Sequence, residues 1–280
     1  MEQKKIDQAL RLIESASKQA LQQGETLELC YSGGKDSDVI LHLARRAGVP
    51  FRAIYKNTTI DPPGTIAHCK QNAVEVVNPK IKFFELCEKR GLPNRFARFC
   101  CGVLKEYKIE NHQLLGIRKF ESVKRSKLYQ EPQLCRFFSK KEYVCQTLPI
   151  LFWTDEDMLD YITQEHVALH PLYYREDGTI DVKRRLGCMC CPLQWKGKRV
   201  QSFKDNPVMV KLWCKAATKF LQTHPDGKIS AKFGGDPYAY FTAQVFFDNI
   251  SDYQKTYGSC FFSGHTDFKQ LLQDYFKIDL

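Results

Sequence analysis

A short glycine-containing segment between two patterned stretches constrains this chain more than any other feature. Leu27 to Tyr31 is a short, mostly apolar run, and Ser32-Gly33-Gly34-Lys35-Asp36-Ser37 follows it directly. The apolar positions from 39 to 47 then recur at helical spacing until Gly48. This order predicts a strand, a loop and a helix. Backbone N–H groups and a helix N-terminus meet in such a loop, which favours the binding of an anion.

The same alternation continues through the first part of the chain. Predicted strands lie at 27–31, 51–57, 81–86 and 113–118, and predicted helices at 3–22, 63–77, 104–111 and 154–164, the last with Thr154 as its N-cap. Strands that alternate with helices imply a parallel sheet with helices on both faces. We therefore predict an α/β fold, a doubly wound and mostly parallel sheet.

The last third of the chain has a different pattern. Residues 207–222, 236–249 and 265–276 are helical in spacing and rich in aromatic residues, and turn signals separate them. No Pro- or Ser-rich linker precedes them. We expect two parts: a nucleotide-binding α/β domain over 1–195, with the leading helix and the cysteines discussed below, and a helical C-terminal extension packed on it over 196–280.

Composition limits the class of protein. The 280 residues are 43% hydrophobic and 26% charged, which excludes a disordered or fibrous chain. The N-terminus has no signal-peptide pattern, and no apolar window of about 18 residues occurs, so we expect a cytoplasmic protein with no membrane contact. A formal net charge of +10 favours an anionic substrate or polymer. Twelve cysteines in a reducing compartment indicate a metal site or a catalytic role.

The polar side chains of the loop are of types that bind phosphate or its counterion. Lys35 supplies a point charge, and the hydroxyls of Ser32 and Ser37 can donate to phosphate oxygens. Asp36 could hold a magnesium ion or the loop itself. Arg118 follows a predicted strand, at the edge where open α/β sheets bind ligands, although Arg118 and Arg125 could also form a solvated face with Glu121.

The segment Ser32–Ser37 resembles the pyrophosphate-binding loop of the adenine nucleotide α-hydrolase superfamily. Further segments resemble the phosphoadenosine-phosphosulfate (PAPS) reductase family within it, in the family's order and over about residues 25–195: Asn57–Thr65, Gly116–Arg125, Pro149–Met158, His170–Tyr173 and Gly187–Pro192. The resemblance implies that Ser32, Gly33, Gly34, Lys35, Asp36, Ser37, Asn57 and Thr58 bind an adenine nucleotide. It also implies that Arg118 and Arg125 face the anionic part of the substrate.

Two short cysteine motifs could form a metal site. Cys100-Cys101 and Cys188-Met-Cys-Cys191 supply enough thiolates for a structural zinc or a 4Fe-4S cluster. Adjacent cysteines suit two irons of a cluster better than one tetrahedral zinc, and buried structural thiols are the alternative. The motifs resemble those of iron-sulfur adenylylsulfate reductases, with Cys100, Cys101, Cys188 and Cys191 as ligands. Cys190 could replace a neighbour, and Arg98, Lys105, Arg184 and Arg185 would offset the thiolate charge. For Cys30, Cys69, Cys87, Cys135, Cys145 and Cys214 we expect core packing.

The sequence departs from true sulfonucleotide reductases at two places. Their C-terminal Glu-Cys-Gly-x-His segment is absent, and only Cys260 with His265 resembles it faintly. The loop has the form found in members that cleave ATP. Together with the cysteine motifs it resembles the DNA phosphorothioation ATP pyrophosphatases and cluster-dependent tRNA thiolases.

Three hypotheses follow. In the first, the protein cleaves ATP with Mg²⁺ to an adenylate and pyrophosphate, permitting sulfur transfer from a donor protein to a tRNA or DNA acceptor. In the second, it reduces adenylylsulfate or PAPS to sulfite with Cys260 or an external thiol. In the third, it binds nucleic acid or another partner without catalysis, using the basic segments 119–127, 183–185 and 196–199 with Tyr173, Tyr174 and Trp195.

Overall fold

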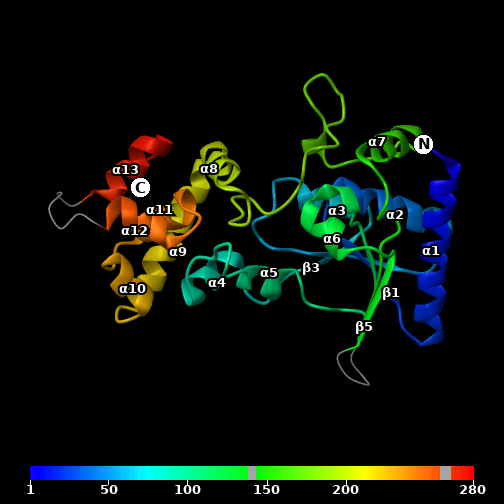
Figure 1. Cartoon of the computed structure of the whole chain (residues 1–280), viewed down its shortest axis with the longest axis horizontal. Helices are drawn as coiled ribbons and strands as arrows, with labels where there is room; N and C mark the ends of the chain where they lie inside the picture. The colour runs from blue at the N-terminus through cyan, green and yellow to red at the C-terminus, as the bar shows by residue number, and fades with distance from the viewer. Residues whose placement is uncertain (138–142, 259–265) are drawn as a thin grey trace. The chain divides into compact units, whose positions relative to one another are not determined.

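The computed structural model describes residues 1–137, 143–258 and 266–280. The chain forms two compact units (Figure 1). The first comprises Met1–Asn57, Asp61–Asn78 and Tyr107–Gly187, and the second comprises Thr58–Ile60, Pro79–Glu106 and Cys188–Leu280. This division differs from the predicted boundary at 195, because residues 79–106 and the segment from Cys188 belong to the helical second unit.

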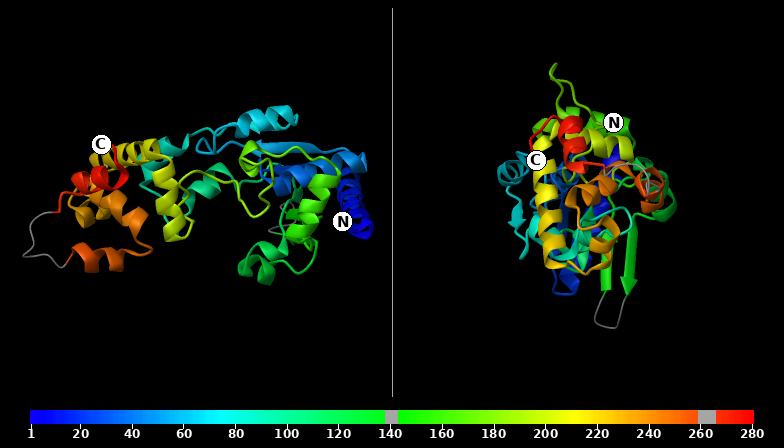
Figure 2. Two further views of the ribbon diagram at one scale, coloured as in Figure 1. Left: turned by 90° about the horizontal axis from the view of Figure 1, so that it is seen from above. Right: turned by 90° about the vertical axis from the view of Figure 1, so that its left-hand side faces the viewer.

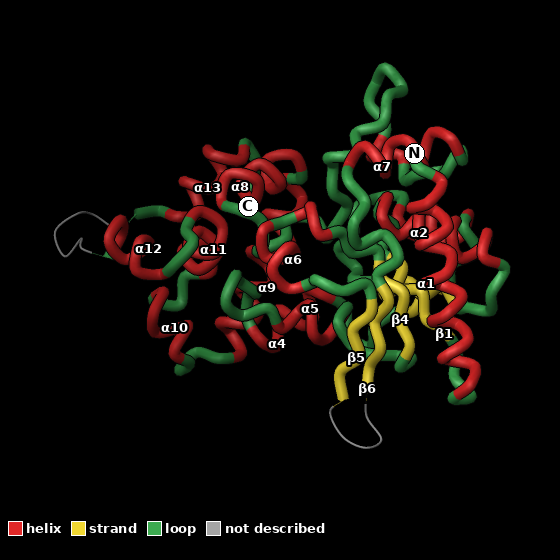
Figure 3. Tube along the Cα trace, turned by 45° about the vertical axis from the view of Figure 1, so that its right-hand side comes forward, coloured by secondary structure: helices red, strands yellow, loops and turns green. Residues whose placement is uncertain are grey.

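A six-stranded sheet forms the centre of the first unit (Figure 3). Its strands are β1 (Leu27–Tyr31), β2 (Arg52–Lys56), β3 (Glu75–Val77), β4 (His112–Leu115), β5 (Gln133–Phe137) and β6 (Tyr143–Thr147). Their order is β3-β2-β1-β4-β6-β5, and only the β5–β6 pair is antiparallel. The predicted mostly parallel α/β sheet is therefore confirmed. The strand order reverses between β1 and β4, and such a switch point is where open α/β sheets bind ligands.

The first unit also contains helices. They are α1 (Gln3–Gln22), α2 (Lys35–Ala47), α3 (Thr65–Gln71), α6 (Val123–Leu128) and α7 (Asp155–Gln164), with the short 3₁₀ turns η1 (Lys119–Glu121) and η2 (Pro171–Tyr173). Ile13 of α1, Leu29 of β1 and Leu114 of β4 are fully buried in one core. Thr154 caps α7 as predicted, since its hydroxyl accepts from the backbone N–H of Asp157 at 3.1 Å.

Three local predictions are wrong. Residues 81–86 form no strand; α4 (Phe83–Arg90) begins there, because Phe83, Leu86 and Cys87 bury one helical face and Glu85 accepts from the backbone N–H of Lys82. The third strand is instead β3. Because β3 lies within the helix predicted over 63–77, the observed helix α3 is shorter than predicted. The helix predicted over 104–111 lies at Phe99–Leu104 (α5).

The second unit consists of helices (Figure 2). Aromatic side chains contribute much of its core. Beside α4 and α5 it contains α8 (Lys196–Asp205), α9 (Pro207–Thr223), α10 (Lys228–Phe233), α11 (Pro237–Phe246), α12 (Ile250–Tyr257) and α13 (Phe268–Phe276). The ring of Phe203 lies 5.5 Å from that of Trp213 and 5.2 Å from that of Phe241. The predicted helical C-terminal part is confirmed, and it has a hydrophobic core of its own. In the described residues no helix has both the length and the hydropathy needed to cross a membrane.

Cys135 and Cys145 form a disulfide. They lie directly opposite each other in the antiparallel β5–β6 pair. The prediction that both are isolated core thiols is wrong, because the antiparallel pairing of β5 with β6 brings them together.

Candidate functional site

The segments that follow β1 and β4 meet at one edge of the sheet. β1 and β4 are adjacent and parallel, so the loop at Ser32–Gly34 and the turn at Gly116 emerge side by side. A Cβ added to Gly116 would lie 2.9 Å from the backbone carbonyl of Asp36. Gly33 has a φ of +74°, which few other residues adopt. Both glycines are therefore required for the close approach of the loop and the turn.

Lys35, Asp36 and Arg118 form a connected group at this edge. Lys35 is only 2% exposed, and its Nζ lies 3.1 Å from Asp36 Oδ2 and 3.5 Å from the carbonyl oxygen of Arg184. Arg118 Nε donates to Asp36 Oδ1 at 2.7 Å. Both carboxylate oxygens of Asp36 thus contact cations. Of its two anticipated roles, holding the loop therefore fits the geometry better than holding magnesium.

Arg118 is fixed on more than one side. The residue is 2% exposed, and beyond Asp36 it binds Asp155 at 2.9 Å and the carbonyl oxygen of Trp153 at 3.4 Å. Its guanidinium is thus hydrogen-bonded to three protein groups. Arg118 therefore positions the loop in addition to any direct contact with an anion.

Arg125 and Arg185 share one carboxylate. Glu121 forms ion pairs with Arg125 and with Arg185, the latter at 3.2 Å, and its backbone carbonyl accepts from Arg185 at 2.8 Å. Burial, and after it the positive charge of Arg185, holds the pKa of Arg125 below its ordinary value. Cations therefore outnumber the carboxylate here, and an anion would relieve their repulsion.

Arg185 is a member of this group that the sequence did not indicate. Arg184 and Arg185 were expected to offset the charge of the cysteine thiolates, whereas Arg185 binds Glu121 and Arg184 donates to the carbonyl oxygen of Leu172. The only sequence signal was the basic character of residues 183–185.

The loop serines bind the loop itself. Ser37 Oγ donates to the carbonyl oxygen of Gly34 at 2.7 Å and lies 3.2 Å from Ser32 Oγ. Ser32 Oγ also accepts from the backbone N–H of Gly34 at 3.4 Å. These bonds shape the loop at the start of α2, so the N–H groups of the helix N-terminus are aligned for an anion.

A buried polar network on both sides of the loop was also missed. The Tyr31 hydroxyl, just before the loop, binds Asp38, just after it, and His68 Nε2 lies 2.9 Å from Asp38 Oδ1. Burial raises the pKa of Asp38. Burial, and to a smaller extent the charge of the neighbouring His68, lowers the pKa of His170. The rings of His68 and His170 lie 5.6 Å apart. The network ties β1, α2 and α3 together beneath the loop.

Asn57 and Thr58 lie in different units. Asn57 ends the first segment of the first unit, where its side-chain amide donates to Asn78 at 2.9 Å. Thr58 belongs to the second unit, and its hydroxyl lies 3.5 Å from the thiol of Cys188. Their nucleotide contact stays a prediction.

The predicted metal ligands share the second unit. Cys100 and Cys101 lie on α5, and Cys188 and Cys191 in the segment that precedes α8. The hydrogen bond of the Cys100 thiol to Cys101, with burial and the charges of Cys101, Cys191 and Cys188, raises the pKa of Cys100. The hydrogen bond with Cys100, assisted by Arg98, lowers the pKa of Cys101 to about 6. Cys100 interacts with the other three thiols, and Arg98 lies beside Cys101, which fits the chemistry of a thiolate-bound metal group. Among the described residues, however, no three candidate ligands already have metal-binding geometry.

Cys190 differs from its neighbours. It is fully buried, and its backbone N–H donates to Ser202 Oγ at 3.1 Å. Burial raises the pKa of its thiol to about 12. It therefore packs in the core of the second unit as a protonated thiol. Cys260 and His265 lie outside the described residues.

Two residues expected in basic or aromatic binding surfaces are buried. Arg199 is 2% exposed and donates to the carbonyl oxygens of Val245 at 2.9 Å and Phe247 at 3.1 Å. Tyr173 is 2% exposed, and its hydroxyl accepts from the backbone N–H of Leu186. Neither side chain forms an open binding surface; Trp195, at 67% exposure, remains accessible.

The sequence of this chain is similar to those of known proteins. The family described as "Phosphoadenosine phosphosulfate reductase domain" has a model that matches residues 26–194, more than half of the chain. An uncharacterized protein of Methanocaldococcus jannaschii is 28% identical over 204 residues, 68% of this chain and 47% of that protein. Sulfate adenylyltransferase subunit 2 of Streptomyces lavendulae is 26% identical over 204 residues, 61% of this chain and 63% of that protein. The chain thus spans about half to two thirds of the length of these relatives.

A solved structure is also similar. The crystal structure of phosphoadenylyl-sulfate (PAPS) reductase from Candida auris, a phosphate complex, has a TM-score of 0.43 and 17% identity to this chain. The similarity covers 65% of this chain and 95% of that one.

Proposed function

Because the chain belongs to the phosphoadenosine phosphosulfate reductase domain family, we propose that it is an enzyme that cleaves an adenine nucleotide, and that the nucleotide is ATP. Relatives named sulfate adenylyltransferase subunit 2 support ATP, since their name describes the transfer of an adenylyl group. The products would be an adenylate of the acceptor and pyrophosphate.

The burial of Lys35 carries this proposal. Lys35, the first residue of α2, is 2% exposed, and it shares the single carboxylate of Asp36 with Arg118. An anion bound at the helix N-terminus would add stabilisation for this buried ammonium. Lys35 and the loop N–H groups would stabilise the negative charge that develops on the departing pyrophosphate. Asp36 would act as a positioning residue that holds Lys35 and Arg118 in place.

The reaction needs an acceptor, a sulfur donor and a thiol reductant besides ATP. An acceptor oxygen attacks the α-phosphorus, the bond from the α-phosphorus to the bridging oxygen breaks, and pyrophosphate leaves with that electron pair. The outer sulfur of a persulfide on a donor protein then attacks the activated position and displaces AMP, and a thiol cleaves the resulting disulfide between donor and acceptor, which leaves the sulfur on the acceptor. Mg²⁺ would arrive with the ATP phosphates and neutralise part of their charge. Arg125 and Arg185 would hold the anionic acceptor or the phosphates.

We further propose that Cys100, Cys101, Cys188 and Cys191 hold a 4Fe-4S cluster, with zinc as the alternative occupant. Such a cluster would supply redox and sulfur chemistry. The chain's own contribution is the set of four thiols, with Arg98 beside Cys101 to offset negative charge. A tRNA or DNA acceptor would suit the net charge of +10.

Product analysis tests the proposal. Protein reconstituted without oxygen is incubated with ATP and Mg²⁺, and pyrophosphate, phosphate, AMP and ADP are quantified. In this assay water takes the place of the acceptor oxygen, so we expect pyrophosphate and AMP from the native protein and neither from Lys35→Met. The exposed Lys18→Gln on α1 is the matched control and should retain activity. Release of ADP and phosphate would contradict the proposal.

The family description supports a second candidate, reduction of adenylylsulfate or PAPS to sulfite. The same loop would bind the nucleotide, and a thiol would attack the sulfur. Sulfite from adenylylsulfate or PAPS in the presence of a thiol would favour this candidate. A member that binds a partner without catalysis would release neither product.

A further inference from the structure

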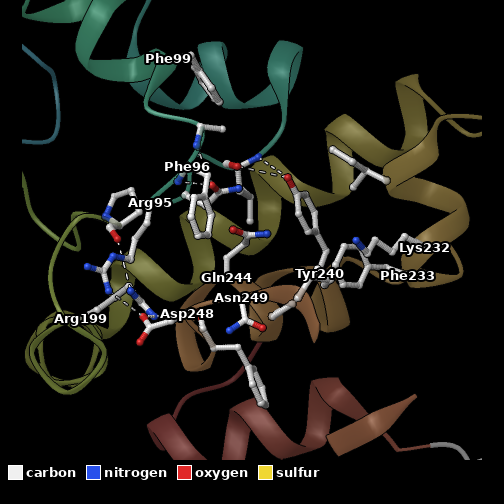
Figure 4. Close-up of a pocket in the computed structure, with 18 of the residues that line it drawn as sticks. Arg95, Phe96, Phe99, Arg199, Lys232, Phe233, Tyr240, Gln244, Asp248 and Asn249 are labelled. Carbon is white, nitrogen blue, oxygen red and sulfur yellow. Dashed lines mark hydrogen bonds and ion pairs between the residues drawn. The ribbon is translucent and has the colours of Figure 1, made fainter. Parts of the chain in front are cut away.

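A second candidate site lies wholly within the helical unit. A cavity of about 540 Å³ opens between the segment 90–99 and helices α10 and α11 (Figure 4). We propose that this cavity binds single-stranded nucleic acid, with a base stacked on Phe96 and the backbone phosphates on surrounding cations. The proposal concerns binding alone and does not depend on ATP cleavage or on a metal.

Phe96 is the first observation. Its side chain is 83% exposed, and it lies beside Gln244 in the cavity (Figure 4). The turn that carries it is fixed, because Asn94 Oδ1 accepts from the backbone N–H groups of Phe96 at 2.9 Å and Ala97 at 2.8 Å. A solvent-exposed aromatic ring on a fixed turn can stack with a nucleic-acid base without a rearrangement of the backbone. Such stacking does not depend on which base is bound.

Charge is the second observation. Among the lining residues that the structure describes, the cations are Arg90, Arg95, Arg199 and Lys232, and the carboxylate is Asp248. Asp248 pairs with Arg95 at 3.4 Å and with Arg199 at 3.2 Å. Arg90 and Lys232 therefore add positive charge that this carboxylate does not balance. Arg90 lies on α4 and Lys232 on α10, so the positive charge comes from two separate helices. Separate cations can bind successive phosphates of a nucleic-acid backbone.

The walls supply further aromatic surface. Phe99 and Phe247 line the cavity, and the Arg90 guanidinium lies 4.7 Å from the ring centre of Phe99. An arginine over an aromatic ring extends the flat surface available to a base. An acidic peptide would use the cations but would leave the exposed Phe96 ring without a planar partner, so nucleic acid accounts for both observations.

The cavity also borders the cysteine motifs. Phe99 directly precedes Cys100, and Pro192 directly follows Cys191, and both line the wall.

Binding of a labelled oligonucleotide tests the proposal. The full chain is titrated into fluorescein-labelled single strands of about a dozen nucleotides, one DNA and one RNA, and into the DNA duplex, with anisotropy as the readout. We expect single strands to bind more tightly than the duplex, because paired bases cannot enter the cavity. The DNA and RNA arms identify which polymer is preferred.

Two variants locate the site. Phe96→Ala should weaken single-strand binding about 5- to 100-fold, the range that loss of one stacked base gives. Lys232→Gln should weaken it less and reduce the slope of log affinity against log salt by about 1. The matched controls are Phe137→Ala, at a site 75% exposed on β5, and Lys18→Gln on α1.

Three results would overturn the proposal: equal loss in Phe96→Ala and Phe137→Ala, duplex binding as tight as single-strand binding, or displacement of the oligonucleotide by polyglutamate at a matched charge concentration. Far-UV circular dichroism of each variant checks that it is folded. Phe96 is largely exposed, so its replacement should leave the thermal unfolding midpoint unchanged.

Discussion

Arg118 Nε lies 2.7 Å from Asp36 Oδ1, so the turn after β4 is fastened to the loop after β1. The two residues are 82 positions apart in sequence, and the adjacency of their strands brings them together. Asp36 in turn contacts Lys35, and the position of the buried ammonium therefore depends on the arginine.

This contact predicts a strong coupling between the two residues. Asp36→Asn and Arg118→Gln should each lower the rate of pyrophosphate release, because each loosens Lys35. The double variant should be less impaired than the sum of the two, with a coupling energy of about 0.5–3 kcal/mol. Steady-state kinetics of the four proteins of the cycle measure it. Strictly additive effects would show that the two side chains act independently.

Loss of the buried charge should be the most damaging single change at the loop. Lys35→Met keeps much of the side-chain volume and removes the ammonium. We expect pyrophosphate release to fall at least about 100-fold, as when one preorganised charge that stabilises a leaving group is removed. Thermal unfolding should show that the variant is folded; a folded Lys35→Met with native activity would refute the role of Lys35.

The close approach at Gly116 should make that residue irreplaceable. A Cβ at Gly116 would lie 2.9 Å from the backbone of Asp36, so Gly116→Ala must displace the loop. We expect a loss of about 1–3 kcal/mol in the free energy of unfolding, together with weaker nucleotide binding. The control is Gly187→Ala, where nothing lies within 4 Å of the added Cβ. Urea unfolding of both variants provides the comparison.

The N-terminus of α7 predicts a pH-dependent contribution to stability. Partial burial opposes ionisation of Asp157, but Lys5 and Thr154 outweigh it, and the pKa of Asp157 is lowered. A lowered pKa in the folded state stabilises the protein above the unfolded value of about 3.9, and this contribution is lost as the pH falls through the folded value.

Asp157→Asn should therefore cost about 1 kcal/mol at neutral pH, since the cap and the ion pair with Lys5 are weakened. The difference from the native protein should shrink as the pH falls below about 4. Urea unfolding at several pH values measures it, and a difference that grows towards acid would contradict the assignment.

The cysteine proposal separates Cys190 from its neighbours. After anaerobic reconstitution, Cys101→Ser and Cys188→Ala should lose most of the bound iron and sulfide. Cys190→Ala should retain both, because its thiol is buried against Ser202. Iron and sulfide analysis with visible absorption spectra provides the readout. Equal iron loss in Cys190→Ala and Cys188→Ala would contradict the ligand assignment, and zinc in place of iron would favour the alternative metal.

Local patterns in the sequence were sufficient for much of the fold and for the loop. The run at 27–31, the glycines and the helical spacing after them are contiguous, so they predicted β1, the loop and α2 correctly. Residues 81–86 were misassigned because short apolar runs suit both strands and helices, and the packing of α4 on the second unit's core decides between them.

Contacts between distant residues could not be predicted. Arg185 pairs with Glu121 and His68 with Asp38 only because the sheet brings their segments together. Arg199 was expected on the surface because it lies in the basic segment 196–199. Its guanidinium is instead buried and donates hydrogen bonds to carbonyl groups at the end of α11. The Cys135–Cys145 disulfide depends on the register of a hairpin that had no clear turn signal.

The product formed from the nucleotide distinguishes ATP cleavage from reduction of a sulfonucleotide. Anaerobically reconstituted protein is given ATP with Mg²⁺ in one reaction and adenylylsulfate or PAPS with a thiol in another, and pyrophosphate and sulfite are measured in both. We expect pyrophosphate from ATP, abolished by Lys35→Met, and no sulfite. Sulfite from the second reaction without pyrophosphate from the first would contradict it.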